Sequence, residues 1–405
     1  MLAPRPPLVA YRDDLARRGT REPFGTSDAT WISMATVLSH GVTVSPEERP
    51  PLLATVREII RGDPALRDVL DAVGEQPSNE FELDGVSPIV RAVVTRMEDD
   101  GALNLAYSTL TILADADLRL STIERGRVLA QLGRVAWRSG ALETSREHYR
   151  KAEVLGRTAH ISELRIRAWI GYSIVARHRG NYPDVRKWGG RAANEAERAD
   201  LPLLASLAYH SLMVAAAVAG DLNAALVYGW RVYRGAVGDR SREAGALLHL
   251  SQTLLEAGYP ETALRGYFAT LERKPTARVA FPTLGGLSLA AARVGNHTLV
   301  HETKARIEEL IANAPYPYGC AGALLELSEA LAIIGDSTDA SDCRTRALAI
   351  ARRHAYHEFV HRLEALRVVP TATRATAPHM LDPDGTEVAR AVASLELVGP
   401  GKDTV

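Results

Sequence analysis

Seven glycines recur at nearly constant intervals through most of this chain of 405 residues. They are Gly101, Gly140, Gly180, Gly220, Gly258, Gly295 and Gly335, and the intervals between them are 39, 40, 40, 38, 37 and 40 residues. A helical hydrophobic pattern of about 14 residues precedes each glycine and another pattern follows it. Glycine at such a place adopts the left-handed backbone conformation that ends a helix. The spacing therefore predicts an all-α chain of repeated antiparallel helix pairs.

The positions that flank the glycines repeat as well. Small residues lie four positions before the glycine, at Ala136, Ala176, Ala216 and Ala291, and twelve positions after it, at Ala152, Ala192 and Ala347. Residues that can cap the next helix follow the glycine directly, at Asn181, Asp221, Asn296 and Asp336. Small side chains at recurrent positions allow antiparallel helices to approach closely.

The pattern resembles the tetratricopeptide repeat (TPR) family from Val86 to Arg367. The best match is formed by Leu132, Gly133, Gly140, Ser145, Tyr149 and Ala152. The period of 37 to 40 residues is longer than the 34 that is usual for the family, so we expect longer helices or loops, as in long-period bacterial repeats. The resemblance implies a right-handed superhelical solenoid of about seven repeats, in which the first helix of each repeat lines a concave groove.

The chain is expected to have four regions. Residues 1–45 form an irregular N-terminal segment, residues 46–84 a helical cap and acidic linker, residues 85–369 the repeat solenoid, and residues 370–405 a mostly disordered tail. A short helix is predicted within the tail at residues 386–397, where it could fold back over the last repeat. Two proline-containing loops, at residues 274–282 and 313–319, are expected to connect repeats.

Charge is unevenly distributed, although the net charge is only −1. Residues 119–191 contain 16 Lys and Arg against 6 Asp and Glu, so the rest of the chain is acidic. Such a segment can attract an acidic partner, or it can be an ordinary solvated helix face. The two cysteines, Cys320 and Cys343, indicate no disulfide framework. No signal-peptide or transmembrane pattern is present, so we expect a cytoplasmic protein that does not span a membrane.

When the repeats of this chain are aligned with the family's repeat pattern, six basic side chains are expected in the groove. They are Arg127, Arg134 and Arg138 from one repeat and Arg167, Arg177 and His178 from the next. Guanidinium groups suit carboxylates and phosphates. The family's clamp for C-terminal carboxylates needs Lys and Asn at two positions, which are Ala130 and Arg134 here, so that clamp is not preserved. Further along, the same face is expected to be apolar, through Leu248, Leu255, Leu289 and Ile333.

One short motif suggests a metal. The sequence His357-Glu358-Phe359-Val360-His361 places two imidazoles one helical turn apart, where they could bind zinc with Glu358 as a general base. A third ligand is needed, and Glu387 and Glu396 are the downstream carboxylates. The alternative interpretation makes this segment the closing helix of the last repeat, with Phe359 in the core.

These observations predict a non-enzymatic scaffold or regulator that binds a protein or peptide with acidic groups. Nucleic-acid binding through residues 119–191 is an alternative, because Lys and Arg neutralise phosphates. A zinc-dependent hydrolase that uses His357 and His361 is the least favoured alternative. The sequence contains no phosphate-binding loop, dinucleotide fingerprint or nucleophile elbow, and we expect no cofactor.

Overall fold

The computed structural model describes residues 84–85, 87–99, 102–114, 120–313, 316–354, 356–365 and 378–395. The expected N-terminal segment and helical cap, Gly101 and most of the tail lie outside these residues. Within the described part every regular element is an α-helix, which confirms the predicted all-α class. Contacts divide the chain into two units, Met1–Leu204 and Ala205–Val405.

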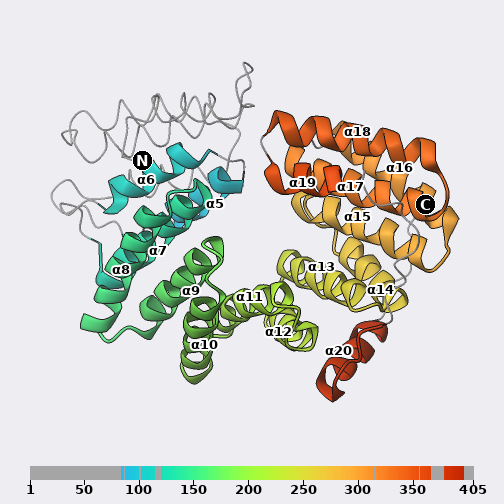
Figure 1. The fold of residues 1–405 in the computed structure, drawn as a ribbon. Coiled ribbons are helices and arrows are strands. Elements are labelled where there is room, and N and C mark those ends of the chain that lie inside the picture. Colours follow the sequence, from blue (N-terminus) through green and yellow to red (C-terminus); the bar gives the residue numbers. More distant parts are fainter. Residues whose placement is uncertain are drawn as a thin grey trace, which may run out of the picture. The chain divides into compact units, whose positions relative to one another are not determined.

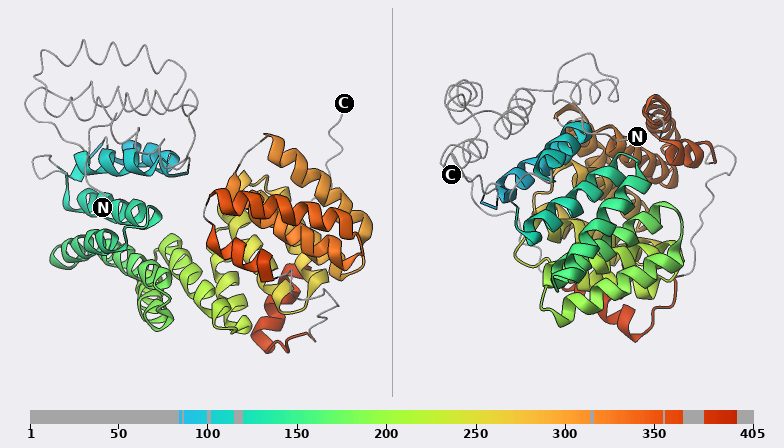
Figure 2. Two further views of the ribbon diagram at one scale, coloured as in Figure 1. Left: turned by 45° about the horizontal axis from the view of Figure 1, so that its top comes forward. Right: turned by 90° about the vertical axis from the view of Figure 1, so that its left-hand side faces the viewer.

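The first unit consists of stacked antiparallel helices (Figures 1 and 2). They are α5 (Ser87–Asp99), α6 (Leu103–Ala114), α7 (Thr122–Arg138), α8 (Leu142–Thr158), α9 (Ser162–His178) and α10 (Tyr182–Arg198). Each helix packs on the next one, and α7 also packs on α5 and on α9. The first helices of successive repeats therefore lie side by side.

The second unit continues the same alternation of helices. It contains α11 (Pro202–Val218), which begins in the first unit, α12 (Leu222–Arg234), α13 (Arg240–Glu256), α14 (Pro260–Glu272), α15 (Ala277–Arg293), α16 (His297–Asn313), α17 (Pro317–Ile333), α18 (Ser337–Arg353), α19 (His357–Ala365) and α20 (Pro383–Ala393). Here too the first helices of repeats stack, since α15 packs on α13 and on α17. Over the described residues α5 to α18 form seven pairs, as expected for about seven repeats of a helical solenoid.

The recurrent glycines end the first helix of each pair. The six that the structure describes have φ between +69° and +89°. The residue after each glycine donates its N–H to the carbonyl five residues earlier, as Ala141 does to Ala136 at 2.9 Å. The side chains of Asn181, Asp221 and Asp336 then cap the following helices. The sequence interpretation of this turn is confirmed.

The long period is explained by long helices. Each of α7, α8, α9 and α10 has 17 residues, and only short turns separate them. The turns between repeats also use a left-handed residue, but it is not always glycine, since His160 and Asp200 have φ of 57° and 52°. The glycine period therefore marks only one of the two turns in each repeat.

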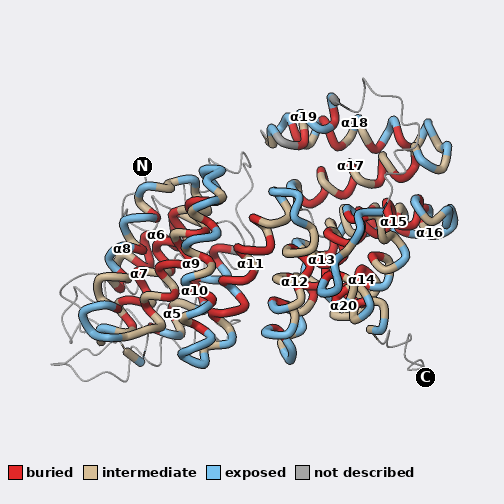
Figure 3. The backbone as a smooth tube through the Cα atoms, turned by 60° about the horizontal axis from the view of Figure 1, so that its bottom comes forward, coloured by how far each residue is buried: buried red, intermediate tan, exposed pale blue. Residues whose placement is uncertain are grey.

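The best-matching sequence set forms a core contact between consecutive repeats. The ring of Tyr149, which is 3% exposed, packs against the backbone of both Gly133 and Gly171. A Cβ atom added at Gly133 or Gly171 would lie 2.8 or 2.4 Å from that ring. Ser145 donates its hydroxyl hydrogen to the carbonyl of Gly133 at 2.8 Å. In both units the buried residues recur along one side of the helices (Figure 3).

Two sequence expectations are wrong in the second unit. Residues 274–282 are not all loop, because α15 begins at Ala277 and contains Pro282. The apolar face expected along the groove is mostly core, since Leu248, Leu255 and Leu289 are buried. Only Ile333 of that set is exposed, at 38%. Helical periodicity alone did not separate the inner face from the face that packs on the neighbouring repeat.

The C-terminal helix lies elsewhere than expected. The sequence indicates a short helix at residues 386–397 that could fold back over the last repeat. The helix exists, but α20 spans Pro383–Ala393 and packs on α12 and α14 (Figure 1). Val388 and Val392 enter the core of the second unit. The backbone N–H of His379 donates to the carbonyl of Ala257 at 2.9 Å, so the segment before the helix is also attached.

Candidate functional site

The six basic residues predicted for the groove lie on the first helices of two consecutive repeats. Arg127, Arg134 and Arg138 are on α7, and Arg167, Arg177 and His178 are on α9. We call these six residues the arginine face. Their chemistry depends on three glutamates that the sequence interpretation did not include.

Glu98 of α5 holds two of the predicted arginines. Its side chain has no exposed area, and its oxygens accept hydrogen bonds from Arg134 Nη2 at 2.7 Å and Arg134 Nε at 2.9 Å. Arg138 Nη1 donates to the same carboxylate at 3.2 Å, and Gln131 Nε2 donates at 3.1 Å. These charge-assisted bonds connect α5 to α7 and supply the buried carboxylate with hydrogen-bond donors.

Glu163 of α9 binds two more residues of the arginine face, Arg127 and Arg167. Its oxygens accept hydrogen bonds from Arg127 Nε at 2.9 Å, Arg127 Nη2 at 2.6 Å and Arg167 Nε at 2.8 Å. Arg127 also donates to Glu124, and Glu124 accepts a further bond from Arg91 of α5. Burial acts to raise the pKa of Glu163, but the bonds from Arg127 and Arg167 outweigh it and lower this pKa to about 2. These ion pairs therefore form a continuous series, which we call the ladder, that connects α5, α7 and α9.

The cluster around Glu98 and the cluster around Glu163 and Glu124 retain a surplus of positive charge. Together they contain five arginines against the three glutamates. Four of the six Arg–Glu pairs join residues 33 to 40 positions apart, which is close to one repeat. The other two, Arg127 with Glu124 and Arg167 with Glu163, lie within one helix. A search for acidic residues one repeat away from each arginine would have found these glutamates in the sequence.

Arg177 differs from the other arginines of the face. It is half-buried, and within the described residues it has no hydrogen bond or ion pair. Burial lowers its pKa, because the charged form loses hydration without gaining a carboxylate. The ring of the neighbouring His178 lies tilted against Trp137 with ring centroids 4.9 Å apart, and burial lowers the pKa of His178 as well. An incoming anion would restore the interactions that the Arg177 guanidinium lacks.

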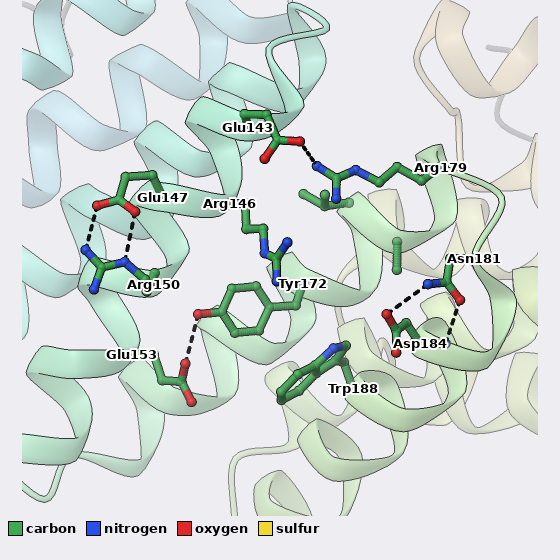
Figure 4. A pocket seen from close by; sticks show the side chains of 12 residues that line it. Glu143, Arg146, Glu147, Arg150, Glu153, Tyr172, Arg179, Asn181, Asp184 and Trp188 are labelled. Atoms are coloured by element: carbon green, nitrogen blue, oxygen red, sulfur yellow. Dashed lines mark hydrogen bonds and ion pairs between the residues drawn. The ribbon is translucent and has the colours of Figure 1, made fainter.

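A pocket of about 430 Å³ between α8, α9 and α10 is a second candidate (Figure 4). Tyr172 and Trp188 form an edge-to-face pair in its wall, with centroids 5.1 Å apart. Its acidic residues already have partners, since Glu143 pairs with Arg179, Glu147 with Arg150, and Glu153 accepts from the Tyr172 hydroxyl.

Arg146 is the remaining cation of this pocket. It extends toward Tyr172 and makes no hydrogen bond or ion pair within the part of the chain described here (Figure 4). The lining nevertheless contains more carboxylates than guanidinium groups. This mixture favours no single ligand class, so the pocket is a weaker candidate than the arginine face.

The histidine motif begins α19. His357 and His361 are exposed one turn apart, while Phe359 and Leu363 of the same helix are buried in the core of the second unit. The side chain of Glu358 and all of Glu396 lie outside the described residues, and Glu387 is on α20. Among the described residues no three His, Cys, Asp or Glu side chains gather as a metal site. The burial of Phe359 agrees with the closing-helix interpretation.

Two further sequence expectations concern the cysteines and the membrane. Cys320 and Cys343 are buried free thiols in the core of the second unit. Burial raises the pKa of Cys343 to about 11, so this thiol stays protonated and unreactive. No described helix combines the length and apolar character needed to cross a bilayer.

Comparison with known proteins supports the fold. No protein-family model and no curated protein sequence matches the chain. A solved structure of a Signal Transduction ATPase with Numerous Domains (STAND) protein with a tetratricopeptide repeat sensor, from Pyrococcus horikoshii, is similar with a TM-score of 0.52 and 12% identity. The match covers 87% of this chain and 54% of that one, so this chain spans about half of that protein's length. Identity this low shows a shared TPR-like helical-repeat fold and nothing further.

Proposed function

We propose that this chain is a non-enzymatic scaffold or regulator that binds an acidic segment of a protein or peptide on the arginine face. The observation that carries this proposal is the half-buried Arg177, a cation without a carboxylate partner among the described residues. A ligand carboxylate at Arg177 would form a charge-assisted bond that the fold itself does not make.

The rest of the face supports an acidic segment over a single small acid. Two clusters with surplus positive charge lie on the same helices as Arg177. Because each arginine there is already held by a glutamate, its position is fixed before a ligand arrives. Preorganised donors reduce the entropy that binding costs. Several weak carboxylate contacts along α7 and α9 would add to the contact at Arg177.

A sensory role is the form of this proposal that agrees with the structural neighbour. That protein is described as containing a tetratricopeptide repeat sensor. In this chain, a bound acidic segment would bridge α7 and α9 and strengthen the contact between two repeats. A protein partner could then recognise the ligand-bound unit.

Nucleic acid is a less suitable partner for the same face. Glu124 and Glu163 alternate with the arginines of the ladder, and a phosphate backbone laid along it would meet these carboxylates as well. At least seven of the arginines in residues 119–191 form ion pairs with carboxylates. Fewer unpaired Lys and Arg side chains therefore remain to neutralise phosphates than the composition suggests. The release of counterions from the nucleic acid, which drives such binding, would be correspondingly small.

The test is a selection of random peptides displayed on phage against the full chain. We expect the enriched peptides to contain two or more Asp or Glu residues, and we expect added salt to weaken their binding. Enrichment of basic or uncharged apolar peptides would refute the proposal. Reversing Arg134 and Arg138 to Glu is an unsuitable test, because both hold the buried Glu98 and their loss would disturb folding.

A further inference from the structure

A second cluster of arginines lies between α9 and α10, away from the arginine face. It lines a pocket of about 320 Å³ formed by Arg165 and Trp169 of α9 and by Arg191, Asn194, Glu195 and Arg198 of α10. The four α10 residues have the i, i+3, i+4, i+7 spacing of one helix face. Three guanidinium groups against one carboxylate make this pocket cationic, in contrast to the mixed pocket of Figure 4.

The one carboxylate of the pocket is already engaged. Glu195 Oε1 accepts hydrogen bonds from Arg165 Nη2 at 2.7 Å and from the Ser162 hydroxyl at 3.2 Å. Arg165 Nε is nevertheless buried without any acceptor. Buried polar groups are almost always hydrogen-bonded in folded proteins, and this N–H is an exception. A ligand in the pocket could supply the acceptor that it lacks.

Arg191 is held in place without using its hydrogen-bond donors. Its guanidinium carbon lies 4.0 Å from the centroid of the Trp169 ring, a distance typical of a cation–π contact. Trp169 is itself fixed, because it is 4% exposed and its indole N–H donates to Glu153 at 3.0 Å. Neither Arg191 nor Arg198 forms an ion pair or hydrogen bond within the described residues. Their N–H groups remain for a ligand.

We propose that this pocket, formed by Arg165, Trp169, Arg191 and Arg198, binds a phosphoryl group. Planar guanidinium forks match the oxygens of a phosphate, and the side chains of the pocket carry a net charge of +2. A phosphomonoester carries a charge of about −1.5 to −2 near neutral pH, which balances the pocket. The pocket volume, near the lower end of the range for small-molecule sites, roughly 300 Å³, leaves room for inorganic phosphate or a small phosphate ester.

The test measures binding of inorganic phosphate to the full chain by isothermal titration calorimetry. We expect saturable binding, weakened about fivefold or more in both Arg191→Gln and Arg198→Gln. Arg186→Gln is the matched control, because Arg186 is an exposed arginine of the same helix that does not line the pocket. It should change the affinity less than about twofold. Absence of saturable binding, or equal weakening by Arg186→Gln, would overturn the proposal.

Two further ligands distinguish the sources of the phosphoryl group. Glycerol phosphate that binds more tightly than inorganic phosphate would identify a small phosphate ester as the ligand, and the reverse order would identify phosphate itself. Acetate that binds as tightly as either would contradict the assignment, because a simple carboxylate would then satisfy the site. This proposal does not depend on the arginine face, and Arg191→Gln should leave binding of acidic peptides there unchanged.

Discussion

Glu163 of α9 accepts two hydrogen bonds from Arg127 of α7, at 2.9 and 2.6 Å, across 36 residues of sequence. The pair joins equivalent helices of consecutive repeats. The arginines of this face therefore have a structural role as well as the binding role that we propose. Substitutions must be chosen so that the two roles are separated.

Loss of the Glu98 carboxylate should destabilise the first unit strongly. Glu98→Ala leaves Arg134, Arg138 and Gln131 without their common acceptor, and the loss of a buried hydrogen-bond partner costs roughly 1–3 kcal/mol. Urea unfolding followed by circular dichroism measures the effect. Glu147→Ala is the control, because its pair with Arg150 is exposed to solvent and exposed ion pairs contribute little to stability. Equal effects of the two substitutions would show that the burial of Glu98 has no energetic consequence.

A methyl group at Gly171 should disrupt the contact between two repeats. Its Cβ would lie 2.4 Å from the Tyr149 ring, and overpacking of this kind costs about 1–3 kcal/mol. Gly190→Ala provides the opposite case on α10, where no atom lies within 4 Å of the added Cβ. That change should stabilise the helix by up to about 1 kcal/mol. Thermal unfolding of the two variants should therefore shift in opposite directions, and shifts of the same sign would contradict this description of the core.

The stability of the second unit should decrease as pH rises. Glu326 Oε2 is buried without a hydrogen-bond partner, and burial raises the pKa of Glu326 to about 8, while Arg362 acts to lower it. The unfolded value is about 4.3. The folded chain therefore keeps the proton over a range in which the unfolded chain has lost it. Stability is unaffected below about pH 4, falls from there to about pH 8, and stays low above that.

Glu326→Gln should remove the part of this pH dependence that comes from Glu326. A smaller decrease should remain, because burial also raises the pKa of Glu256 and Glu329. The free energy of unfolding of the Glu326→Gln variant above about pH 8 should exceed that of the unsubstituted chain by on the order of 5 kcal/mol, the equivalent of the shift in the pKa of Glu326. Differential scanning calorimetry between about pH 5 and pH 9 measures the difference. Glu302→Gln, an exposed change on α16, controls for the loss of one charge. Parallel pH profiles for Glu326→Gln and the unsubstituted chain would show that Glu326 is not protonated in the folded state.

The C-terminal helix should detach when its buried face becomes charged. Val388 contacts the core of the second unit, so Val388→Asp should release α20 from α12 and α14. Hydrogen exchange at α20 should then accelerate by about 100-fold or more, while α17 stays protected. Glu387→Gln, the exposed neighbour on α20, should leave exchange unchanged. Unchanged protection of α20 in Val388→Asp would refute its attachment through this face.

Much of the fold could be predicted because its repeating contacts are local. Gly140 and Asn181 specify turns within a few residues, and the Gly133, Ser145 and Tyr149 set packs within one helix pair and its neighbour. The position of α20 could not be predicted in this way. Its contacts with Ala257 and Asn223 are made more than 100 residues away and follow no repeat.

The candidate sites were harder to predict. The arginines of the face were identified, but Glu98 and Glu163 were counted only as charges, so the pairing that holds Arg134 and Arg127 was missed. The phosphoryl pocket was missed entirely. Its recognition depends on the Arg191 guanidinium lying over Trp169 and on the orphan Arg165 Nε, which are properties of side-chain geometry and not of spacing.

The most direct test of the arginine face compares two single-charge variants for binding of one acidic peptide selected on the full chain. Fluorescence anisotropy should show that Arg177→Gln weakens the peptide about tenfold, because the bond lost is charge-assisted and partly buried. Arg186→Gln, which removes an exposed arginine from α10, should weaken it less than about twofold. Equal affinities for Arg177→Gln and the unsubstituted chain would contradict the proposal that an acidic segment binds at this face.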